Sequence, residues 1–133
     1  MKIFGIGTDI VNISRIKRSI KNVKFIKRIF NEIEIKRCNN HSNKENCFAK
    51  RFAAKEAFAK ALGTGISHGI NFNEIIVYNI KSGKPYIKLL GKTNKVFKKT
   101  IKKEDYNIFL SLSDDKPFAL ATVVITLWTK KKL

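Results

Sequence analysis

The sequence is poor in acidic residues, in cysteine and in long apolar runs. Ten Asp and Glu residues stand against 28 Lys and Arg residues, which leaves a formal net charge of +18 at pH 7. Such a charge attracts polyanions, so an acidic partner is expected. Composition alone does not separate nucleic acid, an anionic membrane, an acidic protein and a phosphorylated small molecule. A lysine-rich proteome is the alternative explanation for part of the excess.

The few cysteines and the short apolar runs exclude several classes of protein. Cys38 and Cys47 are separated by eight residues and match neither a C-x-x-C redox pair nor a zinc knuckle, so free thiols in a reducing compartment are expected. The apolar run after Lys2 is interrupted by Asp9 and is too short for a secretory signal. No segment reaches about 18 uninterrupted apolar residues, the length that a transmembrane helix needs. The sequence therefore predicts a cytoplasmic protein with no membrane partner.

The chain nevertheless has enough apolar material for one core. Its 133 residues are 44% hydrophobic and include ten phenylalanines, and a chain of this length commonly forms one domain that buries about two-thirds of its unfolded surface. No repeat or linker divides it, so residues 1–133 are expected to form a single domain.

The apolar periodicity predicts an α+β fold, with an antiparallel β-sheet packed with one long helix and several short helices. A capping box at Asn31 and Glu34 predicts the start of the third short helix. In chain order, the patterns predict a strand over 3–11, short basic helices through 13–20 and 25–30, a third helix after Asn31, the long helix over about 45–62, strands over 73–80 and 85–90, a lysine-rich helix over 92–103, and strands over 106–113 and 118–128.

Two segments carry residues suited to chemistry. Near the N-terminus, G-I-G-T-D-I-V places Asp9 at the end of an apolar run, and about forty residues later R-F-A-A-K-E-A-F-A-K-A-L-G-T-G begins at Arg51. On a helical wheel of roughly 100° per residue, Glu56 and Lys60 lie about 40° apart, and Lys55 lies about 100° from Glu56. Small and apolar residues fill the opposite arc. Together the segments outline a site for a metal ion and a phosphate ester.

In this order and spacing, the two segments resemble the holo-acyl-carrier-protein synthase family, the small bacterial 4'-phosphopantetheinyl transferases. The resemblance extends over nearly the whole chain, through G-K-P at 83–85, S-L-S at 111–113 and F-A-L-A at 118–121. It implies an enzyme of fatty acid biosynthesis that transfers the 4'-phosphopantetheine arm of coenzyme A to a serine of apo acyl carrier protein and releases adenosine 3',5'-bisphosphate. It also implies Mg²⁺ as cofactor and a homotrimer with active sites between subunits.

The resemblance assigns roles to individual residues. Asp9 and Glu56 match the metal-binding acids of the family, and Mg²⁺ prefers one or two carboxylates together with substrate phosphates and waters. Lys60, the third expected catalytic residue, should contact the pyrophosphate, and Lys55 should support the substrate or charge balance. The expected coenzyme-binding turn consists of Gly63, Thr64 and Gly65. The residues expected to bind the acidic carrier protein are Arg15, Arg18, Lys21, Lys24 and Arg28.

From the residues alone, structural roles are the favoured interpretation. Asp9 suits a helix-capping acid, Glu56 suits an i,i+4 ion pair with Lys60, and a glycine after a helix is most often a cap. A lysine-rich helix face is often only solvated. At the level of function, the alternative is a small basic nucleic-acid-binding protein, supported by the net charge. That alternative leaves the pairing of Asp9 with Glu56 unexplained.

One residue departs from the family pattern. Asp114 follows S-L-S, where many members have a histidine expected near the nucleotide end of coenzyme A. The acceptor of the serine proton also stays open among Glu56, a metal-bound water and another carboxylate.

Overall fold

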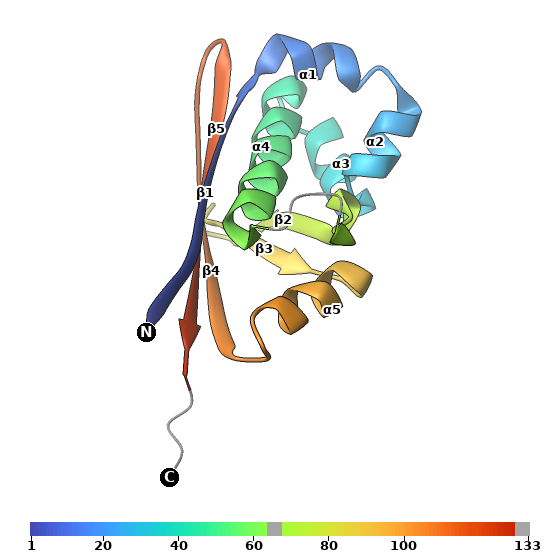
Figure 1. Cartoon of the computed structure of the whole chain (residues 1–133). Helices are drawn as coiled ribbons and strands as arrows, with labels where there is room; N and C mark the ends of the chain where they lie inside the picture. The colour runs from blue at the N-terminus through green and yellow to red at the C-terminus, as the bar shows by residue number, and fades with distance from the viewer. Residues whose placement is uncertain (64–67, 130–133) are drawn as a thin grey trace.

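A long helix, α4, packs across one face of a three-stranded antiparallel sheet (Figure 1). The computed structural model describes residues 1–63 and 68–129. Its strands and helices are β1 (Lys2–Asn12), α1 (Ile13–Ser19), α2 (Val23–Ile29), α3 (Glu32–Asn39), α4 (Lys44–Leu62), the short 3₁₀ helix η2 (Phe72–Glu74), β2 (Ile75–Asn79), β3 (Pro85–Leu89), α5 (Gly91–Thr100), β4 (Asp105–Asp115) and β5 (Phe118–Trp128).

The strands form two antiparallel sheets rather than the single sheet expected from the sequence. The larger has the order β1-β5-β4, and β2 pairs with β3 in a separate hairpin. The α+β class and the predicted order of elements are confirmed. The helices α2 and α3 lie on the side of α4 away from the three-stranded sheet, and α1 continues from the end of β1 at the top of the view (Figure 1).

The contact between β1 and α4 is unusually close because small residues meet there. A Cβ atom added at Gly7 would overlap the carbonyl oxygen of Ala57, and one added at Gly5 would overlap that of Ala61. Ala57 and Ala61 are both buried in α4. Glycine in the strand and alanine in the helix therefore let the two backbones touch, which brings the end of β1 beside the polar residues of α4.

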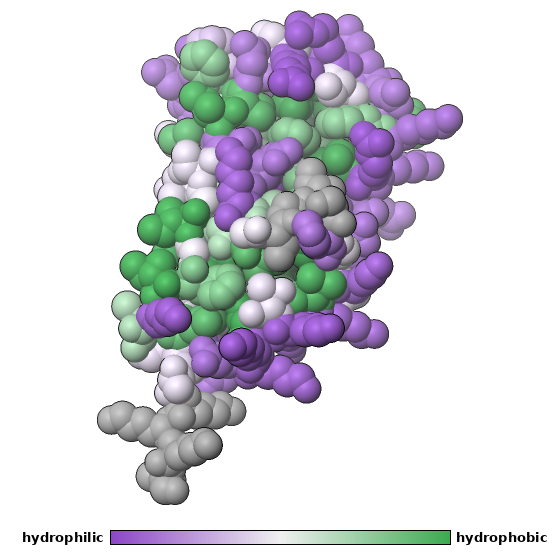
Figure 2. Space-filling model, viewed as in Figure 1, coloured by the Kyte–Doolittle hydropathy of each residue, from purple (hydrophilic) through white to green (hydrophobic). Residues whose placement is uncertain are grey.

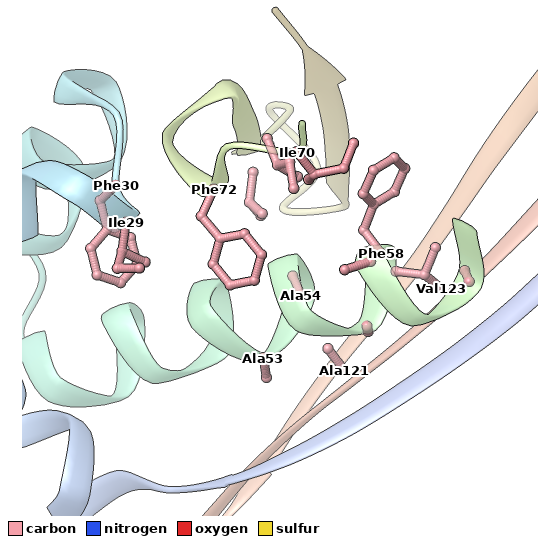
Figure 3. Packing of buried hydrophobic residues seen from close by; sticks show 14 of the residues in the cluster. Ile29, Phe30, Ala53, Ala54, Phe58, Ile70, Phe72, Ala121 and Val123 are labelled. Atoms are coloured by element: carbon pink, nitrogen blue, oxygen red, sulfur yellow. The ribbon is translucent and has the colours of Figure 1, made fainter. Parts of the chain in front are cut away.

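The core extends from this contact to both sides of α4. Figure 3 shows Phe58 of α4 together with Val123 of β5 at one end, and Phe72 beside Ala54 farther along the helix. The ring of Phe30 lies 4.8 Å from that of Phe48, centroid to centroid. Because α4 is covered by the sheet on one side and by α1, α3 and β2 on others, most of its surface is buried.

Local signals define several helix ends close to the predicted positions, although α2 begins at Val23 rather than at 25 and α5 ends at Thr100 rather than at 103. The side chain of Asn12 caps α1 by accepting a hydrogen bond from the Ser14 amide at 2.9 Å. The capping box of α3 is present, with Glu34 Oε1 accepting from the Asn31 amide at 3.0 Å. Gly63 ends α4 with φ of 83°, a left-handed conformation that favours glycine.

The cysteines are not free, contrary to the expectation from their spacing. Cys38 near the end of α3 and Cys47 in the first turn of α4 form a disulfide, with their Cα atoms 5.4 Å apart. The turn between the helices brings residues that are nine positions apart into contact. The predicted cytoplasmic location rested partly on free thiols. The disulfide removes that support, and the location stays a prediction. Among residues 1–63 and 68–129, no helix combines the length and hydrophobicity needed to span a bilayer.

Candidate active site

Asp9 and Lys60 join the last part of β1 to the last turn of α4. Asp9 has the same parity along β1 as Gly5 and Gly7, so its side chain lies on the face toward α4. Lys60 Nζ donates to Asp9 Oδ1 at 3.1 Å and to the carbonyl oxygen of Thr8 at 2.9 Å. The Asp9 side chain is 16% exposed and that of Lys60 is 54% exposed. The lysine side chain is therefore accessible to a bound ligand.

Glu56, one turn before Lys60, faces the same region. Asp9 and Glu56 line one cavity of about 280 Å³, together with Arg15 of α1. Burial raises the pKa of Glu56, the negative charge of Asp9 raises it further, and Lys60 partly opposes both effects. The two carboxylates are therefore close enough to repel each other, which is the situation that a shared cation relieves.

The structure decides against the structural alternatives for both acids. Asn12, not Asp9, caps α1. Within the described part of the chain, Lys60 is within ion-pair distance of Asp9 and not of its i,i+4 neighbour Glu56. Both residues still line the cavity, although Asp9 is bridged to Lys60.

The apolar wall of this cavity was not predicted from the sequence. It is formed by Ile16 of α1, Phe25 of α2 and Phe52 of α4, and the rings of Phe25 and Phe52 are 6.2 Å apart. The only available signal was the position of Phe52 at the start of the R-F-A-A-K-E segment. A single apolar residue in a helical run does not reveal that it borders a site.

The donor set fits a magnesium ion. Asp9 and Glu56 offer hard carboxylate oxygens, and among residues 1–63 and 68–129 no group of three or more His, Cys, Asp and Glu side chains forms a richer site. Mg²⁺ is commonly held by one or two carboxylates and completes its coordination with water and phosphate oxygens. Asp9 and Glu56 would hold the ion, and Lys60 and Arg15 would face the phosphates.

Lys55 does not belong to this site. Its side chain is wholly buried, and its ammonium donates to Glu34 Oε1 at 2.7 Å, to the carbonyl oxygen of Phe72 at 2.8 Å and to that of Ile75. Burial lowers the pKa of Lys55, while Glu34 opposes that shift. The predicted role of Lys55 beside coenzyme A is wrong in this geometry, because the three protein acceptors use its three N–H groups.

The predicted coenzyme-binding turn is only partly described. The amide of Gly63 donates to the carbonyl oxygen of Ala59 at 3.1 Å, so it completes the helix end and is not directed at a phosphate. Thr64 and Gly65 lie outside the described residues, and their role stays a prediction.

The five basic residues predicted to bind the carrier protein are all exposed. Arg15 and Arg18 lie on α1, Lys24 and Arg28 lie on α2, and Lys21 lies between these helices. Only Arg15 lines the cavity of the two acids, whereas Arg28 lines a separate hollow of about 1000 Å³ that also includes Glu74. Arg15 therefore combines a position at the site with a position on the basic surface.

Asp114, the departure from the family pattern, is tied to the start of α4. Its Oδ2 accepts from Asn46 Nδ2 at 2.8 Å, and its Oδ1 lies 3.3 Å from Lys50 Nζ. The hydrogen bond from Asn46 lowers the pKa of Asp114 and outweighs the opposing effect of burial, and Lys50 lowers it further. The acid thus connects β4 to α4.

A fold with this two-acid site corresponds to a known class of transferase. The family model of the 4'-phosphopantetheinyl transferase superfamily matches residues 5–130, and the chain belongs to this superfamily. Within it, the chain is similar to holo-[acyl-carrier-protein] synthases. The protein of that name from Pelagibacter ubique is 49% identical over 125 residues, covering 94% of this chain and 98% of its own length.

Solved structures of such synthases have the same fold. The enzyme from Neisseria meningitidis superposes with a TM-score of 0.84 at 38% identity, covering 93% of this chain and 98% of its own. The enzyme from Bacillus anthracis, solved in complex with CoA (3',5'-ADP), has a TM-score of 0.76 at 35% identity and covers 94% of this chain and 97% of its own. The family resemblance read from the sequence is confirmed.

Proposed function

We propose that this chain transfers the 4'-phosphopantetheine arm from coenzyme A to a serine of apo acyl carrier protein and releases adenosine 3',5'-bisphosphate, as a single transferase domain over residues 1–133. The observation that carries the proposal is that Asp9 and Glu56, from separate elements, line one cavity beside Lys60 and Arg15. The similarity to holo-[acyl-carrier-protein] synthases supports the choice of donor and acceptor. Fatty acid biosynthesis is the proposed context.

The residues in and beside the cavity have different roles. A bound Mg²⁺ would supply positive charge that neutralises the pyrophosphate of coenzyme A. Asp9 and Glu56 would hold that ion, whose charge would offset the two effects that raise the pKa of Glu56, burial first and then the negative charge of Asp9. Lys60 is exposed enough to move its ammonium from Asp9 toward a phosphate oxygen. The apolar wall of Phe25 and Phe52 limits the water around the reacting groups.

The basic residues on α1 and α2 suit an acidic protein substrate. Their charges are exposed and lie on the helices that border the cavity. Each exposed ion pair contributes little affinity, but together such charges accelerate encounter and make it salt-dependent. We expect the transfer rate at low carrier concentration to fall steeply as ionic strength rises.

We also propose that the chain assembles as a homotrimer through the outer face of its three-stranded sheet. On this face β1 exposes Ile6 and Ile10, β4 exposes Phe109, and β5 exposes Leu120 and Trp128. Figure 2 shows apolar residues gathered along the left side of the molecule, where Figure 1 has the sheet. Exposed apolar patches of this kind on a soluble domain commonly mark a protein contact.

The assembly is tested by placing a charge in this face. Phe109→Lys should dissociate the trimer in sedimentation velocity, because its side chain is 52% exposed on the free chain and would be buried in a contact. A wild-type chain that sediments as a monomer would contradict the assembly without affecting the proposed chemistry.

The transfer is tested by mass spectrometry of apo carrier protein incubated with the chain, coenzyme A and Mg²⁺. The wild type should add one phosphopantetheine arm, and Asp9→Ala and Glu56→Ala should not, while both keep their fold by circular dichroism. Glu32→Ala, an exposed acid on α3, serves as the control and should remain active. Turnover retained by both cavity variants would refute the proposal. Duplex DNA or RNA binding that exceeds carrier binding at matched salt would favour the nucleic-acid alternative.

A further inference from the structure

A buried ion pair lies next to the proposed site without taking part in it. Glu34 and Lys55 are each 0% exposed, and their charged groups are 2.7 Å apart. Lys55 also donates to two backbone carbonyl groups. Glu34 also accepts from the Asn31 amide at Oε1 and from the Val77 amide at Oε2, each at 3.0 Å. Each charge is therefore met by several fixed partners in a space closed to water.

The partners come from four elements that are distant in the sequence. Glu34 belongs to the first turn of α3 and Lys55 to the middle of α4, while the carbonyl groups of Phe72 and Ile75 belong to η2 and to the start of β2. The pair joins α4 to the chain segments that pack on the side away from the three-stranded sheet. Through the Lys55 ammonium, α4 is hydrogen-bonded to α3, η2 and β2.

This attachment has a consequence for the next residue along α4. Lys55 and Glu56 are separated by about 100° around the helix axis. Because Lys55 is held on the side of α3 and β2, Glu56 is turned to the side of β1 and α1, where it lines the cavity with Asp9. A rotation or slide of α4 that released Lys55 would move the Glu56 carboxylate away from Asp9.

A contribution to stability alone does not account well for such a pair. Buried ion pairs are weak evidence for stability, because apolar residues of similar volume often replace them without loss, whereas removing one partner is costly. The directional contacts distinguish the pair from an apolar contact. Five hydrogen bonds define where the Lys55 ammonium and the Glu34 carboxylate lie.

We infer that Glu34 and Lys55 are positioning residues, which set the rotation of α4 so that Glu56 faces Asp9 in the geometry needed to share a divalent cation. The inference rests on the proposed function, since it assigns the two acids to the metal. Lys55 acts on the reaction through Glu56 and touches neither coenzyme A nor the carrier protein.

The experiment measures binding of Mn²⁺ alone by electron paramagnetic resonance, and thermal unfolding in parallel, at a temperature where each variant is folded. Lys55→Met and Glu34→Gln should each raise the Mn²⁺ dissociation constant about tenfold or more, as residues that orient metal ligands commonly do. The double variant Glu34→Leu/Lys55→Met removes both charges. It should recover thermal stability relative to Lys55→Met, but its Mn²⁺ affinity should remain low.

Two controls separate positioning from stability and from the proposed function. Ile101→Ala, in the core at the end of α5, should lower the unfolding temperature and leave Mn²⁺ affinity unchanged. Asp9→Ala should abolish binding. If wild type binds and Asp9→Ala does not, but the Glu34 and Lys55 variants bind like wild type, the inference fails while the proposed function stands. Affinity that returns with stability in the double variant also overturns it. A wild type that transfers the arm without binding Mn²⁺ overturns the inference alone, whereas a wild type that neither binds nor transfers overturns both.

Discussion

The close contact between β1 and α4 predicts a large effect for the small substitution Gly7→Ala. The added Cβ would lie 2.7 Å from the Ala61 amide nitrogen and 2.9 Å from the Ala57 carbonyl carbon, and it would overlap the Ala57 carbonyl oxygen. Favourable non-bonded separations are about 3.5–4.0 Å. All three atoms belong to the helix backbone, so no side chain can turn away. The strand and the helix must separate by about 1 Å to remove the overlap.

The cost of this displacement follows from the packing. Adding a methyl group to a well-packed core lowers the unfolding free energy by about 1–3 kcal/mol. The lower entropy of alanine in the unfolded state offsets about 0.4–1 kcal/mol of this loss. The effect on activity should be larger. The same displacement moves Asp9 away from Glu56 and Lys60, and a misplacement of about 1 Å can lower a rate about 100-fold.

Urea unfolding and the carrier-transfer assay test both numbers. We expect Gly7→Ala to lower the unfolding midpoint and to reduce transfer about 100-fold under conditions where it is fully folded. Adding Ala57→Gly should not restore either property, because the overlap is with the backbone of Ala57 and not with its methyl group. Wild-type stability and transfer in Gly7→Ala, or full rescue by Ala57→Gly, would refute the reasoning.

Three other side chains give predictions of different kinds. The helix α5 has no capping side chain of its own, and Glu74 accepts from the amides of Lys92 and Thr93 instead. Glu74→Ala should cost about 1 kcal/mol in urea unfolding at pH 7. Burial acts to raise the Glu74 pKa, but these hydrogen bonds and others outweigh it and lower the pKa. The stabilisation by Glu74 is therefore present above its unfolded-state pKa and is lost as pH falls through its lowered folded-state pKa. If Glu74→Ala cost as much unfolding free energy in strong acid as at pH 7, this assignment would be contradicted. The pKa of Glu56 is raised instead, so its ionised form is unfavourable in the folded protein at neutral pH. Glu56→Gln should be more stable than wild type at pH 7, and this gain should shrink as pH falls through the raised folded-state pKa and vanish below the unfolded-state pKa. The gain should reverse when Mg²⁺ is added, and a less stable variant in metal-free buffer would contradict the assigned burial and repulsion. Lys60→Met should change the free energy of unfolding by less than about 1 kcal/mol, because the lysine of its bridge to Asp9 is exposed, yet it should greatly reduce transfer; unchanged transfer would remove Lys60 from the site.

Much of the architecture could be predicted because its signals are local. The capping box at Asn31 and the glycine after α4 depend on bonds between residues a few positions apart. The alternation of apolar residues in the strands has the same local origin. The identity of the two acids and of Lys60 also came from the sequence, because the two segments that carry them resemble one family.

The tertiary structure decided what each side chain meets. A helical wheel showed Lys55 near Glu56 but did not show that α4 is covered on two sides, so Lys55 was expected at the site and lies buried against Glu34. For the same reason the partner of Lys60 is Asp9, which is distant in the sequence, rather than its helical neighbour. The joining of Cys38 to Cys47 depended on how two helices fold back on each other. Sequence periodicity states which residues share a face, whereas only packing between elements determines what that face contacts.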